Sequence, residues 1–164
     1  GICNGFQALV KSGLLPYGNF EDATETSPTL FYNDADQHVA KMVETRIANT
    51  NSPWLAGVEV GDVYAIPVSH GEGKFVVTDE EFAELRDNGQ IFSQYVDFDG
   101  KPSMDSKYNP NGSVNAIEGI TSKNGQIIGK MGHSERYEDG LFQNIPGNKD
   151  QHLFRSAVEY FTKA

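Results

Sequence analysis

The chain opens on residues 1–11, Gly-Ile-Cys-Asn-Gly-Phe-Gln-Ala-Leu-Val-Lys, which place the only cysteine of 164 residues between two glycines. A nucleophile on a sharp strand-to-helix elbow is held in strained backbone geometry, so the residues two positions on either side of it must be very small. Gly1 and Gly5 meet that demand. The stretch that follows predicts a short helix ended by Gly13, and the N–H groups and dipole at its start favour a thiolate. The pattern therefore predicts that Cys3 is a nucleophile, although a lone cysteine can also be a small buried core residue.

Length, charge and cysteine content narrow the class of protein. One domain is expected from 164 residues, and no apolar run is long enough to span a membrane. Thirteen basic against twenty-three acidic residues give a net charge of −10, which repels phosphates and argues against nucleic acid as a partner. A single cysteine forms no internal disulfide, and the first ten residues lack the pattern of a signal peptide. These features predict a cytoplasmic protein that acts on a small polar substrate or a protein partner.

Strands and helices alternate in the predicted secondary structure. Strands are expected at 38–48, 63–68, 74–77, 91–96, 116–121 and 126–131. The pair Asn124-Gly125 lies between the last two and is typical of a hairpin. Residues 17–37 are acidic and show little periodicity, which predicts a long loop. The mixture indicates an α/β architecture with an antiparallel component.

Two further helices are predicted in the second half of the pattern. Thr78 followed by Glu81 forms a capping box for a helix over roughly 79–88, with Phe82 and Leu85 on its apolar face. A last helix beginning near Asp150 is expected to dock through one apolar face. That face would comprise Leu153, Phe154, Ala157, Val158 and Phe161.

A second chemical motif, Gly-His-Ser-Glu-Arg at 132–136, directly follows the predicted strand over 126–131. Sites of α/β proteins are built at the carboxyl ends of strands. A histidine beside a cysteine can take and return its proton, and a carboxylate behind the histidine fixes its tautomer. Cys3, His133 and Glu135 would together form a complete triad, although a lone histidine near a glutamate is often an ordinary polar residue.

These motifs resemble a known family. Gly1-x-Cys3-x-Gly5-x-Gln7 and His133-x-Glu135 are similar to the nucleophile elbow and the second half of the triad of class I glutamine amidotransferases. Five ordered blocks narrow the resemblance to the glutaminase domain of phosphoribosylformylglycinamidine synthase, the amidotransferase of purine biosynthesis. The blocks are 1–9, 67–75, 109–113, 131–136 and 153–157, and they span nearly the whole chain.

The resemblance implies a flavodoxin-like three-layer α/β sandwich with an antiparallel β extension, and it implies glutamine hydrolysis through a cysteinyl thioester. The N–H of Asn4 would supply an oxyanion donor, while Gln7, Ser69, His70 and Gly71 would line the glutamine pocket. It implies no cofactor or metal in this domain. The implied partner is a separate synthetase region with ATP and Mg, which uses the ammonia to convert formylglycinamide ribonucleotide to formylglycinamidine ribonucleotide.

Two departures from the family pattern shape the expectations. Gly132 and Ser134 stand where prolines often flank the family's histidine, which leaves both catalytic side chains in place. The family also has strands and helices before its cysteine, whereas two residues precede Cys3 here. Residues 1–164 are therefore expected to be the C-terminal part of a single amidotransferase domain, truncated on its N-terminal side. An upstream loop would carry the second oxyanion donor, so little or no glutaminase activity is expected from the isolated chain.

Three other functions are compatible with parts of the pattern. A cysteine hydrolase or peptidase could use the same elbow, because one triad geometry serves many acyl transfers. A zinc module could use His70, His133 and Glu135, although the one-residue gap between the last two is not a familiar zinc spacing. The acidic loop and the amphipathic last helix would also suit a non-catalytic interaction domain.

Overall fold

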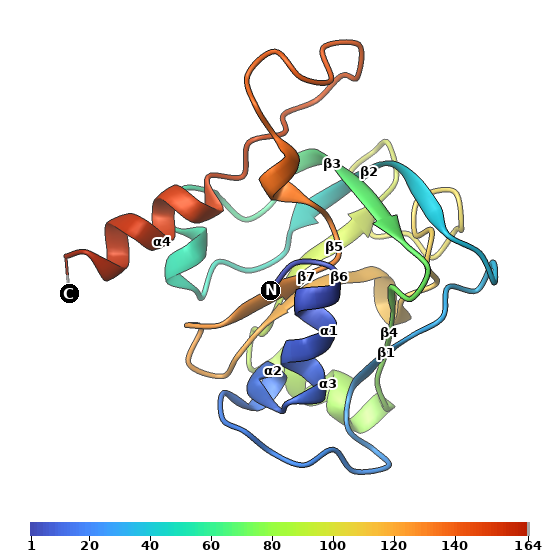
Figure 1. Ribbon diagram of the computed structural model, residues 1–164, viewed down its shortest axis with the longest axis vertical. Coiled ribbons are helices and arrows are strands. Elements are labelled where there is room, and N and C mark those ends of the chain that lie inside the picture. Colours follow the sequence, from blue (N-terminus) through green and yellow to red (C-terminus); the bar gives the residue numbers. More distant parts are fainter. Residues whose placement is uncertain (164) are drawn as a thin grey trace.

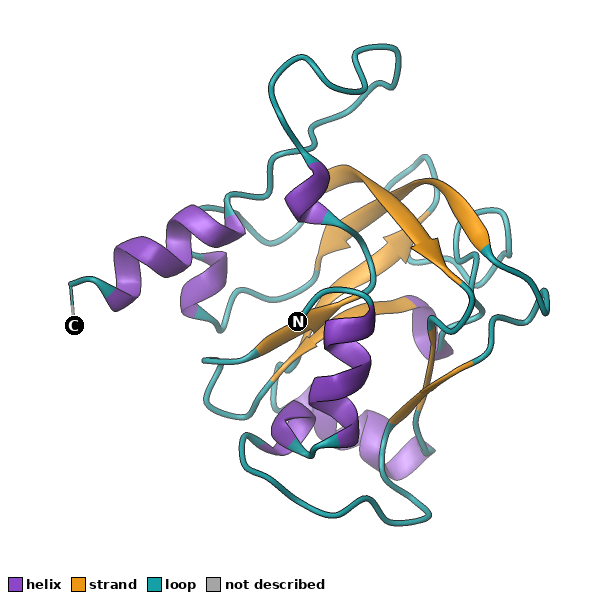
Figure 2. Cartoon of the chain, viewed as in Figure 1, coloured by secondary structure: helices purple, strands orange, loops and turns teal. Residues whose placement is uncertain are grey.

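The computed structural model describes residues 1–163 as a mixed α/β fold built around one curled sheet (Figures 1 and 2). Within these residues, five antiparallel strands follow the order β3-β2-β5-β6-β7. Their bounds are β2 Val39–Ile47, β3 Val63–His70, β5 Ile91–Val96, β6 Ile117–Thr121 and β7 Ile128–Lys130. The predicted α/β class with an antiparallel component is thereby confirmed.

The predicted hairpin over 116–131 is present, with a wider turn than the Asn-Gly pair alone indicates. β6 and β7 pair from Gly119 with Lys130 to Thr121 with Ile128, so the second strand begins two residues later than predicted. The side chain of Asn124 accepts hydrogen bonds inside the turn, from the Ser122 hydroxyl at 2.7 Å and from the N–H of residue 126 at 3.1 Å. These side-chain bonds replace strand pairing at the end of the hairpin.

A second, two-stranded sheet corrects the prediction of an unbroken loop over 17–37. β1, Thr29–Phe31, pairs antiparallel with β4, Lys74–Val76, and Leu30 lies opposite Phe75. Phe75 is fully buried and anchors the pair in the core. Three residues are too few to show an alternating pattern, and the pairing partner lies more than forty residues away, so the sequence carries no local sign of β1.

Helices near the amino terminus cover one face of the large sheet. α1, Asn4–Lys11, lies across the face at β7, and α2, Leu14–Tyr17, continues it beside β6 (Figure 1). The main core cluster joins these helices to the sheet. It contains Phe6, Val10, Leu15, Phe75, Leu85, Ile91, Ile117, Ile120 and Met131. Among the described residues, no helix has both the length and the apolar character needed to cross a membrane.

The helix predicted over 79–88 is present as α3, Asp79–Asp87, with half of its capping box. The Thr78 hydroxyl accepts a hydrogen bond from the Glu81 N–H at 3.2 Å. The Glu81 carboxylate accepts instead from the Tyr17 hydroxyl at 3.1 Å, because α2 brings that tyrosine beside the start of the helix. Leu85 is buried and Phe82 is half-buried, as the predicted apolar face requires.

The last helix, α4, corrects the predicted docking face. It runs over Leu153–Phe161, begins three residues later than predicted, and packs against η1, Pro53–Leu55, at the margin of the molecule (Figure 1). Leu153 and Ala157 are buried. The other three expected members, Phe154, Val158 and Phe161, are between 47% and 62% exposed. A single short 3₁₀ turn covers only a narrow stripe of a helix, so the wider apolar face stays uncovered.

Candidate active site

Residues 1–3 run parallel to β7 and lead into an elbow at Cys3. The N–H of Gly1 donates to the carbonyl of Ile128 at 2.7 Å, the N–H of Lys130 donates to the carbonyl of Gly1 at 3.1 Å, and the N–H of Cys3 donates to the carbonyl of Lys130 at 2.8 Å. Cys3 then adopts φ 52° and ψ −110°, a strained conformation for a residue with a side chain. Helix α1 begins at the next residue, so the sharp turn into a helix predicted at Cys3 is present, and it follows an isolated parallel bridge between Ile2 and Lys130.

The two flanking glycines differ in how much space surrounds them. A Cβ on Gly1 would lie 2.5 Å from the carbonyl oxygen of Gly5, so this position requires glycine. A Cβ on Gly5 would meet no atom within 4 Å among the described residues. The predicted steric demand therefore holds at Gly1 and is wrong at Gly5, because Gly5 already lies in the first turn of α1 and faces open space.

The Cys3 thiol is partly buried, and its environment acts on its acidity in both directions. The sulfur donates to the carbonyl of Ser69 in β3 at a Sγ–O distance of 3.7 Å. Burial raises the pKa of the Cys3 thiol, whereas the Asn4 N–H and then Arg136 lower it, and Glu135 raises it. The Asn4 N–H at the helix start thus favours the thiolate as predicted, but burial outweighs it. A nucleophilic Cys3 needs a base.

His133 is buried and its ring is oriented by a carboxylate. Its Nδ1 lies 2.5 Å from Oε1 of Glu135 in the turn η3, Ser134–Arg136. A proton on Nδ1 leaves Nε2 as the basic nitrogen, and Nε2 has no hydrogen-bond partner within residues 1–163. The His133 N–H donates to the carbonyl of Pro67 at 2.8 Å. The arrangement is that of a histidine ready to accept a proton.

The nucleophile and the histidine are held at the same edge of β3. Carbonyls two residues apart in a strand point to the same side, so those of Pro67 and Ser69 face one edge. Pro67 accepts from the backbone of His133 and Ser69 accepts from the thiol of Cys3. Residues 130 positions apart in the chain are thereby brought to one short stretch of a single strand.

The residues predicted to bind glutamine fall into two groups. Asn4 and Gln7 line a hollow of ≈ 680 Å³ between α1 and the segment from Ala23 to Leu30, and Gln7 Nε2 donates to the carbonyl of Glu72 at 2.7 Å. Among the described residues, the lining of this hollow excludes Cys3 and the stretch 69–71. Ser69 lies instead against the thiol, and its hydroxyl contacts His38 Nε2 at 3.0 Å.

His70 is buried beneath the loop that follows β3, where Asn33 holds it. The amide nitrogen of Asn33 donates to the carbonyls of His70 at 2.8 Å and Gln37 at 3.0 Å, so its oxygen is the acceptor. That oxygen accepts from His70 Nδ1 at 3.1 Å and from the Gly73 N–H at 3.0 Å. Burial lowers the pKa of His70 to about 4, so the ring is neutral near pH 7. Gly71 is tied to the same residue, because its carbonyl accepts from the Asn33 N–H at 2.9 Å.

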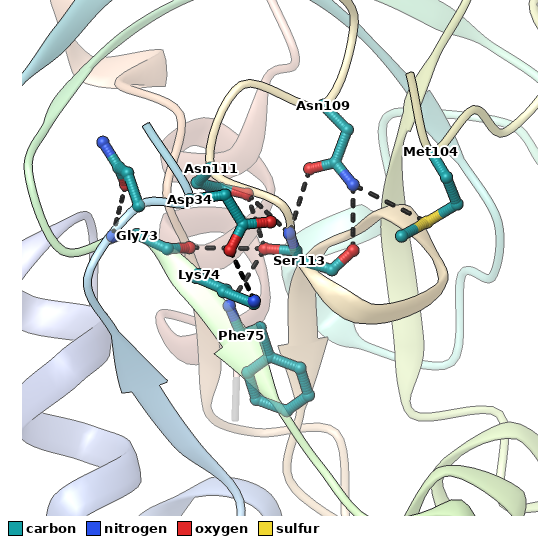
Figure 3. A network of polar contacts seen from close by, with 9 residues as sticks. Asp34, Gly73, Lys74, Phe75, Met104, Asn109, Asn111 and Ser113 are labelled. Carbon is teal, nitrogen blue, oxygen red and sulfur yellow. Dashed lines mark hydrogen bonds and ion pairs between the residues drawn. The ribbon is translucent and has the colours of Figure 1, made fainter. Parts of the chain in front are cut away.

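A buried polar network supports this loop from behind, and the sequence block 109–113 builds it (Figure 3). The Ser113 hydroxyl contacts Oδ1 of Asn111 at 2.7 Å and accepts from the Phe75 N–H at 3.0 Å. Oδ1 of Asn109 accepts from the Ser113 N–H at 3.1 Å. Neither this network nor the role of Asn33 was identified from the sequence, since an asparagine in a polar loop carries no local sign of a buried bond.

The proposed zinc module finds no support in the geometry. Within residues 1–163, no three histidine, cysteine, aspartate or glutamate side chains gather as a metal site requires. His70 Nδ1 is engaged by Asn33, and His133 Nδ1 by Glu135.

Comparisons with known proteins agree with the geometry. The model of the CobB/CobQ-like glutamine amidotransferase domain matches residues 1–161. Phosphoribosylformylglycinamidine synthase subunit PurQ of Thermomicrobium roseum is 39% identical over 139 residues, which are 85% of this chain and 53% of the relative. The subunit PurQ of Gloeobacter violaceus is 35% identical over 158 residues, covering 96% of this chain and 61% of the relative. The chain thus spans between half and two thirds of these relatives.

A solved structure is also similar. A chain of PurLQS from Thermotoga maritima superposes with a TM-score of 0.69 at 27% identity, covering 98% of this chain and 60% of that one. The match supports the class I amidotransferase fold that the sequence motifs predict.

Proposed function

The chain belongs to the CobB/CobQ-like glutamine amidotransferase family, and from this premise we propose that it hydrolyses glutamine to glutamate and ammonia with Cys3, His133 and Glu135 as its triad. One observation carries the proposal. The partly buried thiol of Cys3 and the backbone N–H of His133, whose ring Glu135 orients, bond carbonyls two residues apart on one edge of β3. The family and this arrangement are independent lines of support.

In the proposed reaction, His133 takes the thiol proton and the Cys3 thiolate attacks the side-chain carboxamide carbon of glutamine. The Asn4 N–H, which already lowers the pKa of the thiol, would donate to the oxyanion of the tetrahedral intermediate. The C–N bond breaks as His133 returns the proton to the leaving ammonia. His133 then deprotonates water, which hydrolyses the thioester to glutamate and regenerates the thiol. Glu135 keeps the ring in the tautomer that both proton transfers need.

We further propose that the ammonia is used by a phosphoribosylformylglycinamidine synthase, with ATP bound on a synthetase partner and none on this chain. The similar relatives are PurQ subunits of phosphoribosylformylglycinamidine synthase and the similar structure is that of PurLQS, which supports this partner. The proposed product is formylglycinamidine ribonucleotide, made from formylglycinamide ribonucleotide. Glutamate release by the chain alone, and then with its synthetase partner, tests the assignment and the predicted weak activity of the isolated chain.

The triad is tested by intact mass after treatment with an electrophilic glutamine analogue. The expected result is one adduct on Cys3 that excess glutamine suppresses, no adduct on Cys3→Ser, and slower labelling of His133→Ala. A generic thiol reagent is the control for an accessible thiol. Labelling by the generic reagent alone would show that this chain by itself does not form a glutamine site. Equal labelling by peptide-derived electrophiles would contradict glutamine as the substrate and favour a different cysteine hydrolase.

A further inference from the structure

A buried ion pair lies directly under the turn that carries His133. The ammonium of Lys130, at the end of β7, is 3.4 Å from Oε1 of Glu118 in β6, and both side chains are fully buried. Desolvation makes a buried ion pair weak as a source of stability, since apolar residues of similar size often serve equally well. The place of this ion pair beside the His133 turn, and not its contribution to stability, therefore indicates a role in the site.

The ion pair forms hydrogen bonds with both residues that flank His133 in the chain. Oε1 of Glu118 accepts from the N–H of Gly132 at 2.7 Å. The ammonium of Lys130 donates to the Ser134 hydroxyl at 2.9 Å and to Oε1 of Gln151 at 2.8 Å. His133 is thus the residue between two anchored positions, and hydrogen bonds to a charged group are the stronger kind.

Lys130 also holds the nucleophile. Its backbone carbonyl accepts from the Cys3 N–H at 2.8 Å, and its backbone N–H donates to the carbonyl of Gly1 at 3.1 Å. One residue therefore contacts the elbow through its main chain and the histidine turn through its side chain. Displacing its ammonium would remove the anchor of Ser134 while leaving the elbow bonded to β7.

We propose that Lys130 and Glu118 are positioning residues that fix His133 relative to the Cys3 thiol, an inference that rests on the proposed function. They touch neither the thiol nor the imidazole in these contacts, and they act through Gly132 and Ser134. Glycine and serine flank His133, so the turn lacks ring-locked backbone on either side, and the ion pair supplies the rigidity that a reacting base needs.

The test measures the rate of Cys3 alkylation by iodoacetamide against pH, in this chain and its variants. A histidine aligned with the thiol raises the thiolate population near neutral pH, so loss of alignment moves the profile upward. The other groups that act on the Cys3 thiol, namely the Asn4 N–H, Arg136 and Glu135, are unchanged in every variant tested, and His133 is unchanged in the ion-pair variants. His133→Ala provides the reference for a thiol without its base.

Three variants separate positioning from folding. The double variant Glu118→Met with Lys130→Met removes both anchors and both charges together, so no unpaired charge is buried. Glu118→Gln with Lys130→Met keeps an oxygen for the Gly132 N–H and is the conservative rescue. Gln90→Met is the matched control, because the buried amide of Gln90 bonds the carbonyls of Pro16 and Thr121 away from His133. Each is assayed well below its own melting temperature.

For Glu118→Met with Lys130→Met, the pH profile of alkylation is expected to shift upward by about one pH unit and to coincide with that of His133→Ala. This shift corresponds to roughly tenfold slower alkylation at pH 7. The profile of Glu118→Gln with Lys130→Met is expected to lie between this profile and that of the wild type. Gln90→Met is expected to keep the wild-type profile and to have a lower melting temperature. If Glu118→Met with Lys130→Met fails to fold, the positioning role is tested by the same comparison with Glu118→Gln plus Lys130→Met. Wild-type behaviour of the folded ion-pair variants, with His133→Ala shifted, would overturn the positioning role alone. A wild-type profile for His133→Ala would overturn the thiol–histidine pair and the proposed function with it.

Discussion

His70 makes the stability of this fold acid-sensitive in a defined window. Burial lowers the pKa of the folded-state ring from 6.5 to about 4. Below pH 6.5 the His70 ring binds a proton in the unfolded chain but not in the folded chain, so acid favours unfolding. The stability from neutral His70 is complete above pH 6.5 and is lost as the pH falls toward 4. Linkage gives a loss of about 2 kcal/mol between pH 7 and pH 5, rising to about 3 kcal/mol at pH 4.

The perturbation is His70→Asn, which keeps an N–H donor near the position of Nδ1 for Asn33 but does not titrate. Urea unfolding is followed at pH 7 and pH 5 for both proteins, and the two losses of unfolding free energy are subtracted. Carboxylates that titrate in this window are present in both chains and cancel in the difference. The variant is expected to lose about 2 kcal/mol less than the wild type over this interval, whatever its stability at pH 7.

The matched control is His152→Asn, at the start of α4 and remote from the loop. Its backbone lies at φ 54°, which asparagine tolerates well. This variant is expected to keep the acid-dependent loss that His70 causes, since His70 is unchanged. Parallel pH dependence of wild type and His70→Asn, within 0.5 kcal/mol, would refute the argument that His70 is buried in its neutral form.

Three other outcomes follow from the packing. Gly1→Ala should lower the melting temperature and slow thiol labelling, because its Cβ would lie 2.5 Å from a carbonyl oxygen, whereas Gly5→Ala should be neutral or stabilising by up to about 1 kcal/mol in thermal unfolding. Lys130→Met alone should cost about 3–5 kcal/mol in urea unfolding, since its carboxylate partner is left buried and unpaired, and a loss under about 1 kcal/mol would contradict a charged pair. Leu153→Ala should cost about 2–5 kcal/mol by the same assay, while Val158→Ser, on the exposed side of α4, should stay within about 0.5 kcal/mol, and equal losses would contradict the narrow docking stripe.

Local patterns accounted for most of the secondary structure and for the chemical motifs. Strand β2 was predicted within one residue at each end, and α3 within one, because alternation and a capping threonine act within a few residues of chain. The elbow at Cys3 and the turn at His133 were likewise identified from their immediate neighbours. β1 and the exposed side of α4 were not, because each depends on a partner far away in the sequence.

The sequence by itself therefore determined the family and the elbow, and it predicted the nucleophile, base and orienting carboxylate that we propose, since these depend on residue type and short spacing. Only the tertiary structure decided which distant groups meet. Glu118 and Lys130 look like ordinary solvated charges in the sequence, and they become a buried pair because β6 and β7 bring them together in the folded sheet. Asn33 likewise gains its three side-chain hydrogen bonds to His70 and Gly73 from packing alone. Burial and pairing are set by segments that fold together, and no local pattern of residues encodes them.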